Sequence, residues 1–314
     1  MRKILFAFAA LALSACVTPS SAQSTQDGKA SAPEPKEAVL TDTVRLPNAK
    51  IDLILEYRDA DLQAHKDKIA AHVDDTYVQL TNFFGGPPKK LNGEPYDRLT
   101  VKLYNGLGGE ADPEWIEVGI SDSPLHGFYG LEMTIIHEMF HLWSAETFRY
   151  ADGKEQWFNE GVGEYFTFRI AAEMGVIPED QVLSLFSRYL ATYLSATGIG
   201  ELSMREAGST QELKQQHHFL VYHGGYVAGL VLDHKIRLDS GGQHTLADLM
   251  RELYQTNSRA NPYAMKTLIE ATQKSTSVDI SDFLHRYIDG SDIILVGSYF
   301  DLGMLDVMST YGVE

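Results

Sequence analysis

The spacing of apolar and polar residues predicts a small sheet in the first third of the folded chain. Residues 51–57 and 99–104 are rich in apolar and β-branched side chains between turn residues, which predicts two strands. Between them, residues 61–84 carry apolar side chains three and four positions apart and end at Gly-Gly-Pro-Pro, which predicts one helix. Residues 116–120 are a candidate third strand after the loop NGLGGEADPEW.

Beyond residue 131 the spacing is almost wholly helical. We expect helices at about 131–146, 158–174, 178–195, 211–237, 245–256, 262–273 and 279–289. Pro178 and Pro262 suit first helical turns, Asn261 suits an N-cap and Gly290 suits a C-cap. A mixed sheet followed by a mostly α-helical bundle predicts an α+β fold, with the junction near residue 131.

The start of the chain resembles a bacterial lipoprotein signal. A short basic start and an apolar core lead to Leu-Ser-Ala-Cys, which predicts a signal over residues 1–15 and lipidation of Cys16. The alternative is a plain secretory peptide cut nearby. Val17, rather than Asp, follows the cysteine, so we expect an outer-membrane lipoprotein facing the periplasm.

The rest of the chain divides into three expected parts. Residues 16–43 are rich in Ser, Ala, Pro and Gln without apolar periodicity and predict a flexible tether. Residues 44–130 are expected to form the α/β part of a catalytic domain, and residues 131–314 its helical part.

The charge balance narrows the classes of partner. The chain of 314 residues has 43 acidic against 26 basic side chains, a formal net charge of −17, without a basic run. An acidic protein of this kind is not expected to bind nucleic acid. The balance leaves room for a substrate with a cationic end.

The pattern that indicates chemistry is His-Glu-Met-Phe-His at residues 137–141. Residues four apart lie on one face of a helix, so His137 and His141 can bind one metal ion. Glu160, 18 residues further on and on the next predicted helix, can supply the third ligand. Zinc fits such ligands, and catalytic zinc sites leave one position for water. The alternative is two ordinary amphipathic helices that carry polar residues.

Two kinds of neighbour complete the predicted site. Glu138 stands beside the first ligand and can accept a proton from a zinc-activated water, then pass it to the leaving amine. Glu164, one helical turn after Glu160, is placed to orient the imidazole of His137, and Asn159 is a further candidate for supporting the ligands. The alternative for Glu164 is a solvated helix glutamate.

These residues carry a resemblance to a known family. The motif HEMFHLW and the later WFNEGVGEYF are similar to those of the gluzincin metallopeptidases, most closely to the glycyl aminopeptidase family. The resemblance extends over about residues 50–310 and includes the segments 222–233, 245–254 and 279–292. It implies a thermolysin-like catalytic domain with one zinc ion bound by His137, His141 and Glu160, and Glu138 as the general base.

The resemblance also implies a residue that stabilises the transition state. Tyr222 stands where related aminopeptidases have the tyrosine that binds the oxyanion, with Tyr226 and His223 as the next candidates. A core tyrosine on an apolar helix is the alternative for Tyr222. Gly224 departs from the family, which has lysine there, and whatever that lysine positions is expected to be missing.

The candidate substrate-binding residues are Gly108, Gly109 and Glu110. Their loop lies where relatives have a glycine-rich edge segment, although it lacks the family pattern. Glu110, with Glu114 and Glu117, is a candidate partner for the ammonium group of a peptide. The alternative is a solvated acidic loop.

The predicted function is that of a zinc metallopeptidase, an aminopeptidase acting on short peptides. Two other functions stay open. One is a non-catalytic, zinc-bound lipoprotein that binds peptides or an envelope partner. The other is a zinc hydrolase for another small substrate.

Overall fold

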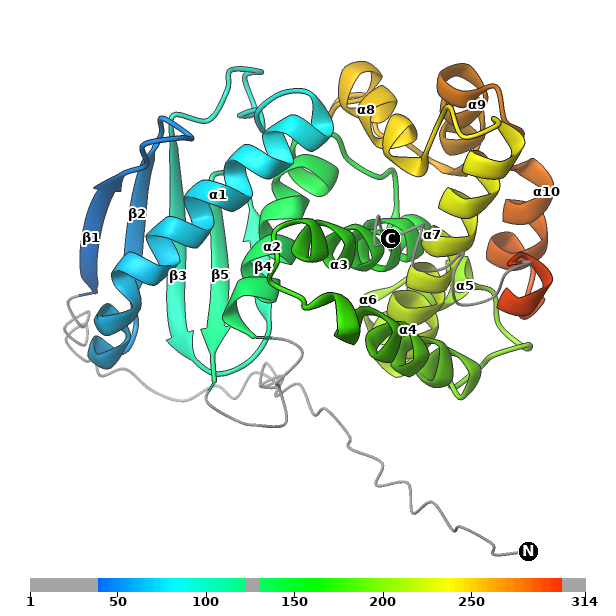
Figure 1. Ribbon diagram of the computed structural model, residues 1–314, viewed down its shortest axis with the longest axis horizontal. Coiled ribbons are helices and arrows are strands. Elements are labelled where there is room, and N and C mark those ends of the chain that lie inside the picture. Colours follow the sequence, from blue (N-terminus) through cyan, green and yellow to red (C-terminus); the bar gives the residue numbers. More distant parts are fainter. Residues whose placement is uncertain (1–38, 122–129, 301–314) are drawn as a thin grey trace, which may run out of the picture. The chain divides into compact units, whose positions relative to one another are not determined.

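The computed structural model describes residues 39–121 and 130–300 (Figure 1). The predicted signal and Cys16 lie outside these residues. None of the described helices has the length and the apolar composition needed to cross a membrane.

The first elements form a mixed five-stranded sheet with the strand order β1-β2-β3-β5-β4. The strands are β1 (Leu40–Arg45), β2 (Asp52–Tyr57), β3 (Arg98–Asn105), β4 (Gly109–Asp112) and β5 (Trp115–Ile120). The three inner strands run parallel, and the two edge strands pair antiparallel with their neighbours. The three predicted strands are therefore β2, β3 and β5.

The sequence did not reveal the two edge strands. β1 begins at Leu40, inside the predicted tether, and β4 lies inside the predicted loop. Both are short and mostly exposed, so neither has the apolar alternation by which a half-buried strand is recognised.

Helix α1 (Lys66–Phe84) follows the 3₁₀ helix η1 (Ala60–His65) and lies across the sheet (Figure 1). It ends where predicted, because Gly85 takes a left-handed conformation (φ 82°) that favours glycine. Helix α2 (Leu131–His141) packs next to α1 and against strands β4 and β5. The predicted junction between sheet and bundle is therefore the place where α2 begins.

The remaining described elements are mostly helical, as predicted. They are η3 (Leu142–Thr147), η4 (Gly153–Glu155), η5 (Trp157–Val162), α3 (Gly163–Glu173), α4 (Glu179–Leu194), α5 (Met204–Gly208), α6 (Gln211–Gln216), α7 (His218–Asp239), α8 (Leu246–Thr256), α9 (Met265–Thr276), α10 (Ser281–Leu284), η6 (His285–Asp289) and η7 (Val296–Ser298). Segments η3, η5 and η6 are π-helical turns that continue neighbouring helices. The fold class predicted from the sequence, α+β, is confirmed.

Three details of the helical part differ from the prediction. The helix expected at residues 211–237 divides at His217 into α6 and α7, and α5 was not foreseen. Helix α9 begins at Met265 after Ala264, so Asn261 is not its N-cap. Instead, the backbone of Asn261 pairs with Ser258 in a turn, which competes with helix formation.

Helix α7 is the central element of the bundle. It is buried on all sides from Gly224 to Asp233. The carboxylate of Asp233, fully buried, accepts hydrogen bonds from the Tyr165 hydroxyl (2.7 Å) on α3 and from the backbone N–H of Leu246 (2.6 Å) on α8. These bonds fix α7 relative to two neighbouring helices, and α7 carries Tyr222.

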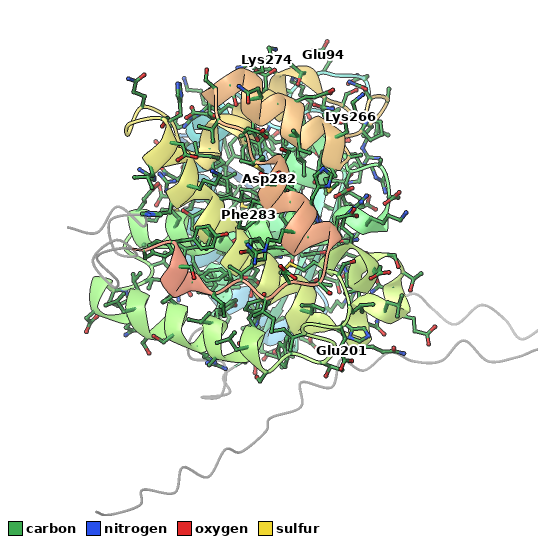
Figure 2. The ribbon with its side chains drawn as sticks, turned by 90° about the vertical axis from the view of Figure 1, so that its right-hand side faces the viewer. Glu94, Glu201, Lys266, Lys274, Asp282 and Phe283 are labelled. Atoms are coloured by element: carbon green, nitrogen blue, oxygen red, sulfur yellow. The ribbon has the colours of Figure 1, made fainter. Side chains whose placement is uncertain are left out.

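The last helices cover one side of the bundle. Figure 2 shows α9, from which Lys266 and Lys274 project, and α10, which carries Asp282 and Phe283. Phe283 is 4% exposed, and its ring lies 4.9 Å from that of Tyr287. This side is therefore held by apolar packing and carries its charges on the outside.

Candidate metal centre

Helix α2 brings His137 and His141 together. Their Nε2 atoms lie 3.0 Å apart, and both side chains are buried. Every residue of the helix from Met133 to His141 is buried, so the two imidazoles lie in the interior, and their spacing of four places them on one face of the helix. The predicted pairing of the two histidines is therefore observed.

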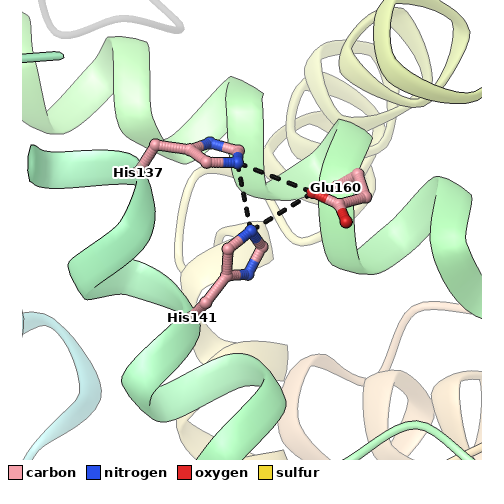
Figure 3. Close-up of side chains that lie close together, drawn as sticks. All are labelled: His137, His141 and Glu160. Carbon is pink, nitrogen blue, oxygen red and sulfur yellow. Dashed lines mark hydrogen bonds and ion pairs between the residues drawn. The ribbon is translucent and has the colours of Figure 1, made fainter. Parts of the chain in front are cut away.

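Glu160 reaches the same point from the π-helical turn η5. Its Oε2 lies 3.6 Å from His137 Nε2 and 3.2 Å from His141 Nε2 (Figure 3). Extra residues in a π-helical turn change the direction of the side chains that follow, and such turns are frequent at functional sites. The three side chains form the group of potential metal ligands predicted from the sequence.

The hydrogen bonds behind the rings determine which nitrogen of each histidine faces the centre. The hydroxyl of Thr167 donates to the carbonyl of Gly163 (2.9 Å), so its oxygen can accept the Nδ1–H of His137 at 3.4 Å. His141 Nδ1 lies 3.2 Å from Ser144 Oγ, which donates to Asn159 Oδ1 (3.3 Å). Both rings therefore present Nε2 to the centre, and this nitrogen binds a metal ion when it carries no proton.

This arrangement fits zinc. Two imidazole nitrogens and one carboxylate oxygen converge on a common centre. Zinc held tetrahedrally at about 2.0–2.1 Å places its ligand atoms about 3.3 Å apart. The three observed separations are 3.0, 3.2 and 3.6 Å. The chemistry of the ligands and their spacing thus both suit a zinc ion, as the sequence predicts.

The charges of the site favour a cation. Burial lowers the pKa of His137, but the hydrogen bond to Glu160 and the charges of Glu164 and Glu138 outweigh burial and raise that pKa to about 9. Burial opposes ionisation of Glu160 too, yet His141, His137 and Lys214 hold its pKa well below the usual range. Glu160 is therefore an ionised carboxylate, the form that binds a metal ion.

Glu138 lies on α2 between the two histidines and is 7% exposed. Burial raises the pKa of its carboxyl group, and the neighbouring histidines oppose that shift. Strand β4 covers the group closely: a Cβ atom on Gly109 would come within 2.6 Å of Glu138 Cγ and Oε1. Only a glycine at this position lets the edge strand approach Glu138 so closely.

Tyr222 comes to the site from α7. Burial, together with the charges of Glu160, Glu138 and Glu164, raises the pKa of its hydroxyl far above the usual range. Its ring stacks on His218, with 4.1 Å between centroids. Tyr222 therefore keeps its proton and can donate it in a hydrogen bond next to the metal ligands.

The two reserve candidates on α7 lie in other surroundings. The ring of Tyr226, 1% exposed, packs with Tyr189 (4.6 Å) and Phe168 (5.6 Å). His223 stacks on Tyr189 at 4.1 Å, and burial lowers its pKa to about 3. Both belong to the aromatic packing between α4 and α7.

The supporting residues are only partly those expected. Asn159 takes part through Ser144, as described above. Glu164 is buried, accepts a hydrogen bond from the Tyr189 hydroxyl (3.5 Å), and contributes its charge at His137. The sequence does not mark Ser144 and Thr167 as site residues, although each lies three residues after a predicted site residue, a spacing that places side chains on one helical face.

Two glycines set the distance between η5 and α7. A Cβ on Gly161 would lie 2.4 Å from Gly225 Cα, and a Cβ on Gly225 would lie 2.2 Å from the carbonyl oxygen of Trp157. Backbones this close leave no room for side chains between them. The contact brings Tyr222, one turn before Gly225, next to Glu160.

Gly224, the departure from the family pattern, points away from the site. A Cβ at this position would meet Met204 Cε at 2.8 Å and Tyr193 Cδ2 at 3.2 Å. A lysine here would have to enter the packed interior between α5 and α4.

The register of the edge strand separates the candidate substrate-binding residues. Gly109 pairs with the buried Val118 and faces Glu138, whereas Glu110 pairs with Glu117. Because successive side chains of a strand point to opposite faces, Glu110 lies on the face away from Glu138. Glu117, on that same face, forms an ion pair with Arg58 (2.6 Å), and Glu114 lies 3.6 Å from Lys90 Nζ.

Comparison with known proteins agrees with this site. Residues 131–226 match the M61 glycyl aminopeptidase family, a segment that contains all the candidate ligands, Glu138 and Tyr222. No curated protein sequence matches the chain.

Solved structures share the fold. An aminopeptidase N family protein from Idiomarina loihiensis is 20% identical with a TM-score of 0.68, covering 83% of this chain and 48% of that one. An M1 zinc metallopeptidase from Deinococcus radiodurans is 14% identical with a TM-score of 0.57, covering 85% and 54%. A mutant of that type, bound to a Tyr-Ser-Ala substrate, is 14% identical with a TM-score of 0.56, covering 82% and 52%.

The chain spans about half the length of these structures. Their likeness establishes the fold, and the family match covers the segment in which the metal ligands lie. Together they confirm the resemblance of the chain to the gluzincin zinc metallopeptidases, with residues 131–226 matching the M61 glycyl aminopeptidase family.

Proposed function

We propose that this protein is a zinc-dependent peptidase that cleaves peptide bonds with one zinc ion per chain. His137, His141 and Glu160 hold the metal. The observation that carries the proposal is the convergence of their three ligand atoms, with Nδ1 of each imidazole facing a hydroxyl group, that of Thr167 or that of Ser144. A cation is the partner that such a set requires.

Glu138 is the general base in this proposal. When bound, zinc lowers the pKa of a water molecule to about 7 and polarises a carbonyl group. Glu138 accepts the proton of the attacking water and returns it to the leaving amine. Its burial beneath Gly109 keeps bulk water from competing for that proton.

Tyr222 stabilises the negative charge that develops on the carbonyl oxygen. A single aimed hydrogen bond of this kind contributes about 2.7–4 kcal/mol to lowering the barrier. The hydroxyl is next to Glu160 and stays protonated, which supports this role.

The substrate is a short peptide that binds along β4 as an added strand. An edge strand offers free backbone groups to an extended peptide, and β4 is the last strand of the sheet, with Gly109 against Glu138. Gly108 precedes it with a left-handed backbone (φ 84°) that begins the strand. Aminopeptidase action is supported by the family match and by the relative bound to a Tyr-Ser-Ala substrate.

Two variants test this function. We expect Glu138→Gln to keep zinc and to lose hydrolysis by roughly 10²–10⁴-fold, the usual contribution of a general base. We expect His141→Ala to lose the metal, and activity with it. Zinc content is measured together with a digest of a broad peptide library, with and without a chelator.

The same digest separates the other functions. A zinc-loaded wild-type protein that cleaves no peptide would support the non-catalytic binding protein, and cleavage of esters or small amides alone would support another hydrolase. Product masses from peptides with free and with blocked amino ends distinguish terminal trimming from internal cleavage. A zinc content in His141→Ala equal to that of the wild type would contradict the proposed set of metal ligands.

We further propose that the protein is a lipoprotein of the bacterial outer membrane, attached through Cys16 and facing the periplasm. The signal-like residues 1–15 and the following tether support this location. Replacement of Cys16 by serine is expected to release the protein into the soluble envelope fraction. Retention of the Cys16→Ser variant in the membrane would speak against the anchor.

A further inference from the structure

The two oxygens of Glu160 have different partners. Oε2 faces the two histidines, and Figure 3 shows the second oxygen turned away from them. That second oxygen, Oε1, accepts a hydrogen bond from Lys214 Nζ at 3.0 Å. The carboxylate is therefore shared between the metal centre and a lysine.

Lys214 is held firmly in this position. Its side chain is 14% exposed and that of Glu160 12%, so water screens the pair far less than it screens surface ion pairs. Lys214 lies on α6, whose first turn is capped by the Thr210 hydroxyl, which accepts from the N–H of Leu213 (3.2 Å). The division of the predicted long helix at His217 gives α6 its own direction.

The same ammonium group also lies near Tyr222. Lys214 Nζ is 5.7 Å from the centroid of the Tyr222 ring, and the charge of Glu160 helps to raise the pKa of the Tyr222 hydroxyl. Lys214 thus contacts a proposed ligand and lies close to the proposed oxyanion donor. Loss of the lysine would free one carboxylate oxygen next to both.

We propose that Lys214 is a positioning residue that keeps Glu160 bound to the metal through one oxygen only. This inference rests on the proposed function, since it assigns a task within the zinc site. With Oε1 engaged by Lys214, the carboxylate cannot chelate the ion. The coordination position that catalytic zinc sites keep open then stays open.

A second consequence concerns charge. Glu138, Glu160 and Glu164 all contribute negative charge at His137, and the ammonium of Lys214 offsets part of it. Removing that ammonium makes the site more attractive to a cation, while it leaves Glu160 free to chelate. The metal is then expected to stay bound and catalysis to suffer.

The test uses the full-length protein with four substitutions. Lys214→Met removes the ammonium and keeps an unbranched side chain, and Lys214→Arg keeps the positive charge. Gln215→Met, exposed on the same helix, controls for changes to α6. Lys274→Met removes an exposed lysine that pairs with Glu252 at 2.6 Å, which controls for net charge.

Three quantities are measured: the affinity for zinc, the visible spectrum of the cobalt(II)-substituted protein, and kcat and KM on a peptide. For Lys214→Met we expect zinc to bind at least as tightly as in the wild type. The cobalt spectrum should weaken as the coordination number rises, and kcat should fall by roughly 10–100-fold, as is typical when a partner of a metal ligand is removed. KM should change little, and Lys214→Arg should recover most of kcat.

The outcomes separate this inference from the proposed function. If wild-type protein binds cobalt but cleaves nothing, the spectral change in Lys214→Met still tests the lysine. A wild-type spectrum and kcat in Lys214→Met would overturn the inference and leave the peptidase intact. Weaker zinc binding in that variant would overturn it as well, because a merely structural support would loosen the whole site.

Discussion

The two walls of the site are built differently. The ligand wall, made by α2 and η5, carries buried side chains whose polar atoms are held by further buried groups such as Ser144, Thr167 and Asn159. The edge wall, made by β4, is a short strand that is largely exposed and pairs on one side only within the described sheet.

The two walls therefore suit different tasks: the ligand wall suits metal binding and catalysis, and the edge wall suits recognition of the substrate. Buried hydrogen-bonded networks fix positions, and a metal centre needs its ligands fixed before the ion arrives. An exposed edge strand offers backbone groups that accept many sequences. Changes to the groups that hold the metal ligands should therefore alter metal binding, and changes to the edge wall should alter turnover without affecting the metal.

The largest effect on the edge wall is expected from Gly109→Ala. Its Cβ would lie 2.6 Å from Glu138, so the strand or the glutamate must move. A misplacement of about 1 Å at a catalytic group can cost about 10²-fold in rate. We expect kcat to fall by about that factor with zinc content unchanged.

Ala111→Ser is the control, because Ala111 is the next residue of β4 on the same face. It should retain most of kcat. If both variants lose kcat equally, the strand as a whole, rather than its contact with Glu138, would be responsible.

The ligand wall could be predicted from the sequence for a local reason. His137 and His141 share a helical face by spacing alone, and Glu160 follows in a motif of fixed distance. Lys214 could not be predicted, because its contact with Glu160 joins residues that are 54 positions apart, and nothing in its neighbourhood marks it.

Strand β4 of the edge wall could not be predicted from the sequence, because it depends on pairing with another strand and not on its own residues. Its four residues, Gly-Glu-Ala-Asp, have neither β-branched side chains nor apolar alternation, so pairing with β5 alone makes them a strand. The sequence marks the glycines of this loop as candidates, but only pairing in the folded sheet sets the register that turns Gly109 toward Glu138 and Glu110 away from it.

On the ligand wall, Ser144→Ala and Thr167→Val are expected to weaken zinc binding. Each removes the group that accepts the Nδ1–H of one histidine. Loss of such a partner typically costs about 10–100-fold in metal affinity or activity. Competition with a chromogenic chelator measures the affinity of each variant.

Ser195→Ala serves as the control, since its hydroxyl bonds only backbone carbonyls of α4 among the contacts described. Zinc affinities equal to the wild type in both ligand-wall variants would mean that packing alone orients the imidazoles.

Substitutions where η5 and α7 cross, behind the ligand wall, should have a smaller effect, which is measured as the free energy of unfolding. A Cβ on Gly161 would lie 2.4 Å from Gly225 Cα, whereas a Cβ on Gly163 would lie 3.7 Å from its nearest neighbours. We expect Gly161→Ala to lower the free energy of unfolding by about 1–3 kcal/mol, the usual cost of overpacking. Gly163→Ala should be neutral or stabilising by up to about 1 kcal/mol, since alanine favours a helix.

Denaturant unfolding of Gly161→Ala and Gly163→Ala measures the difference in the free energy of unfolding between these two nearby positions. Equal destabilisation by both substitutions would show that the backbones of η5 and α7 do not need the close contact at Gly161.

The smallest effect is expected from Glu110→Gln, where the register argues against the candidate ammonium partner. Glu110 pairs with Glu117 on the face of the sheet away from Glu138. An exposed charge there should contribute a few tenths of a kcal/mol, which corresponds to a change within about twofold in KM for peptides with free amino ends. The test is to measure KM of Glu110→Gln on matched peptides with free and with blocked amino ends. A large rise in KM for the free peptides alone would mean that β4 turns when substrate binds, so that Glu110 reaches the amino end, and the edge wall would then select substrates by charge as well as by backbone.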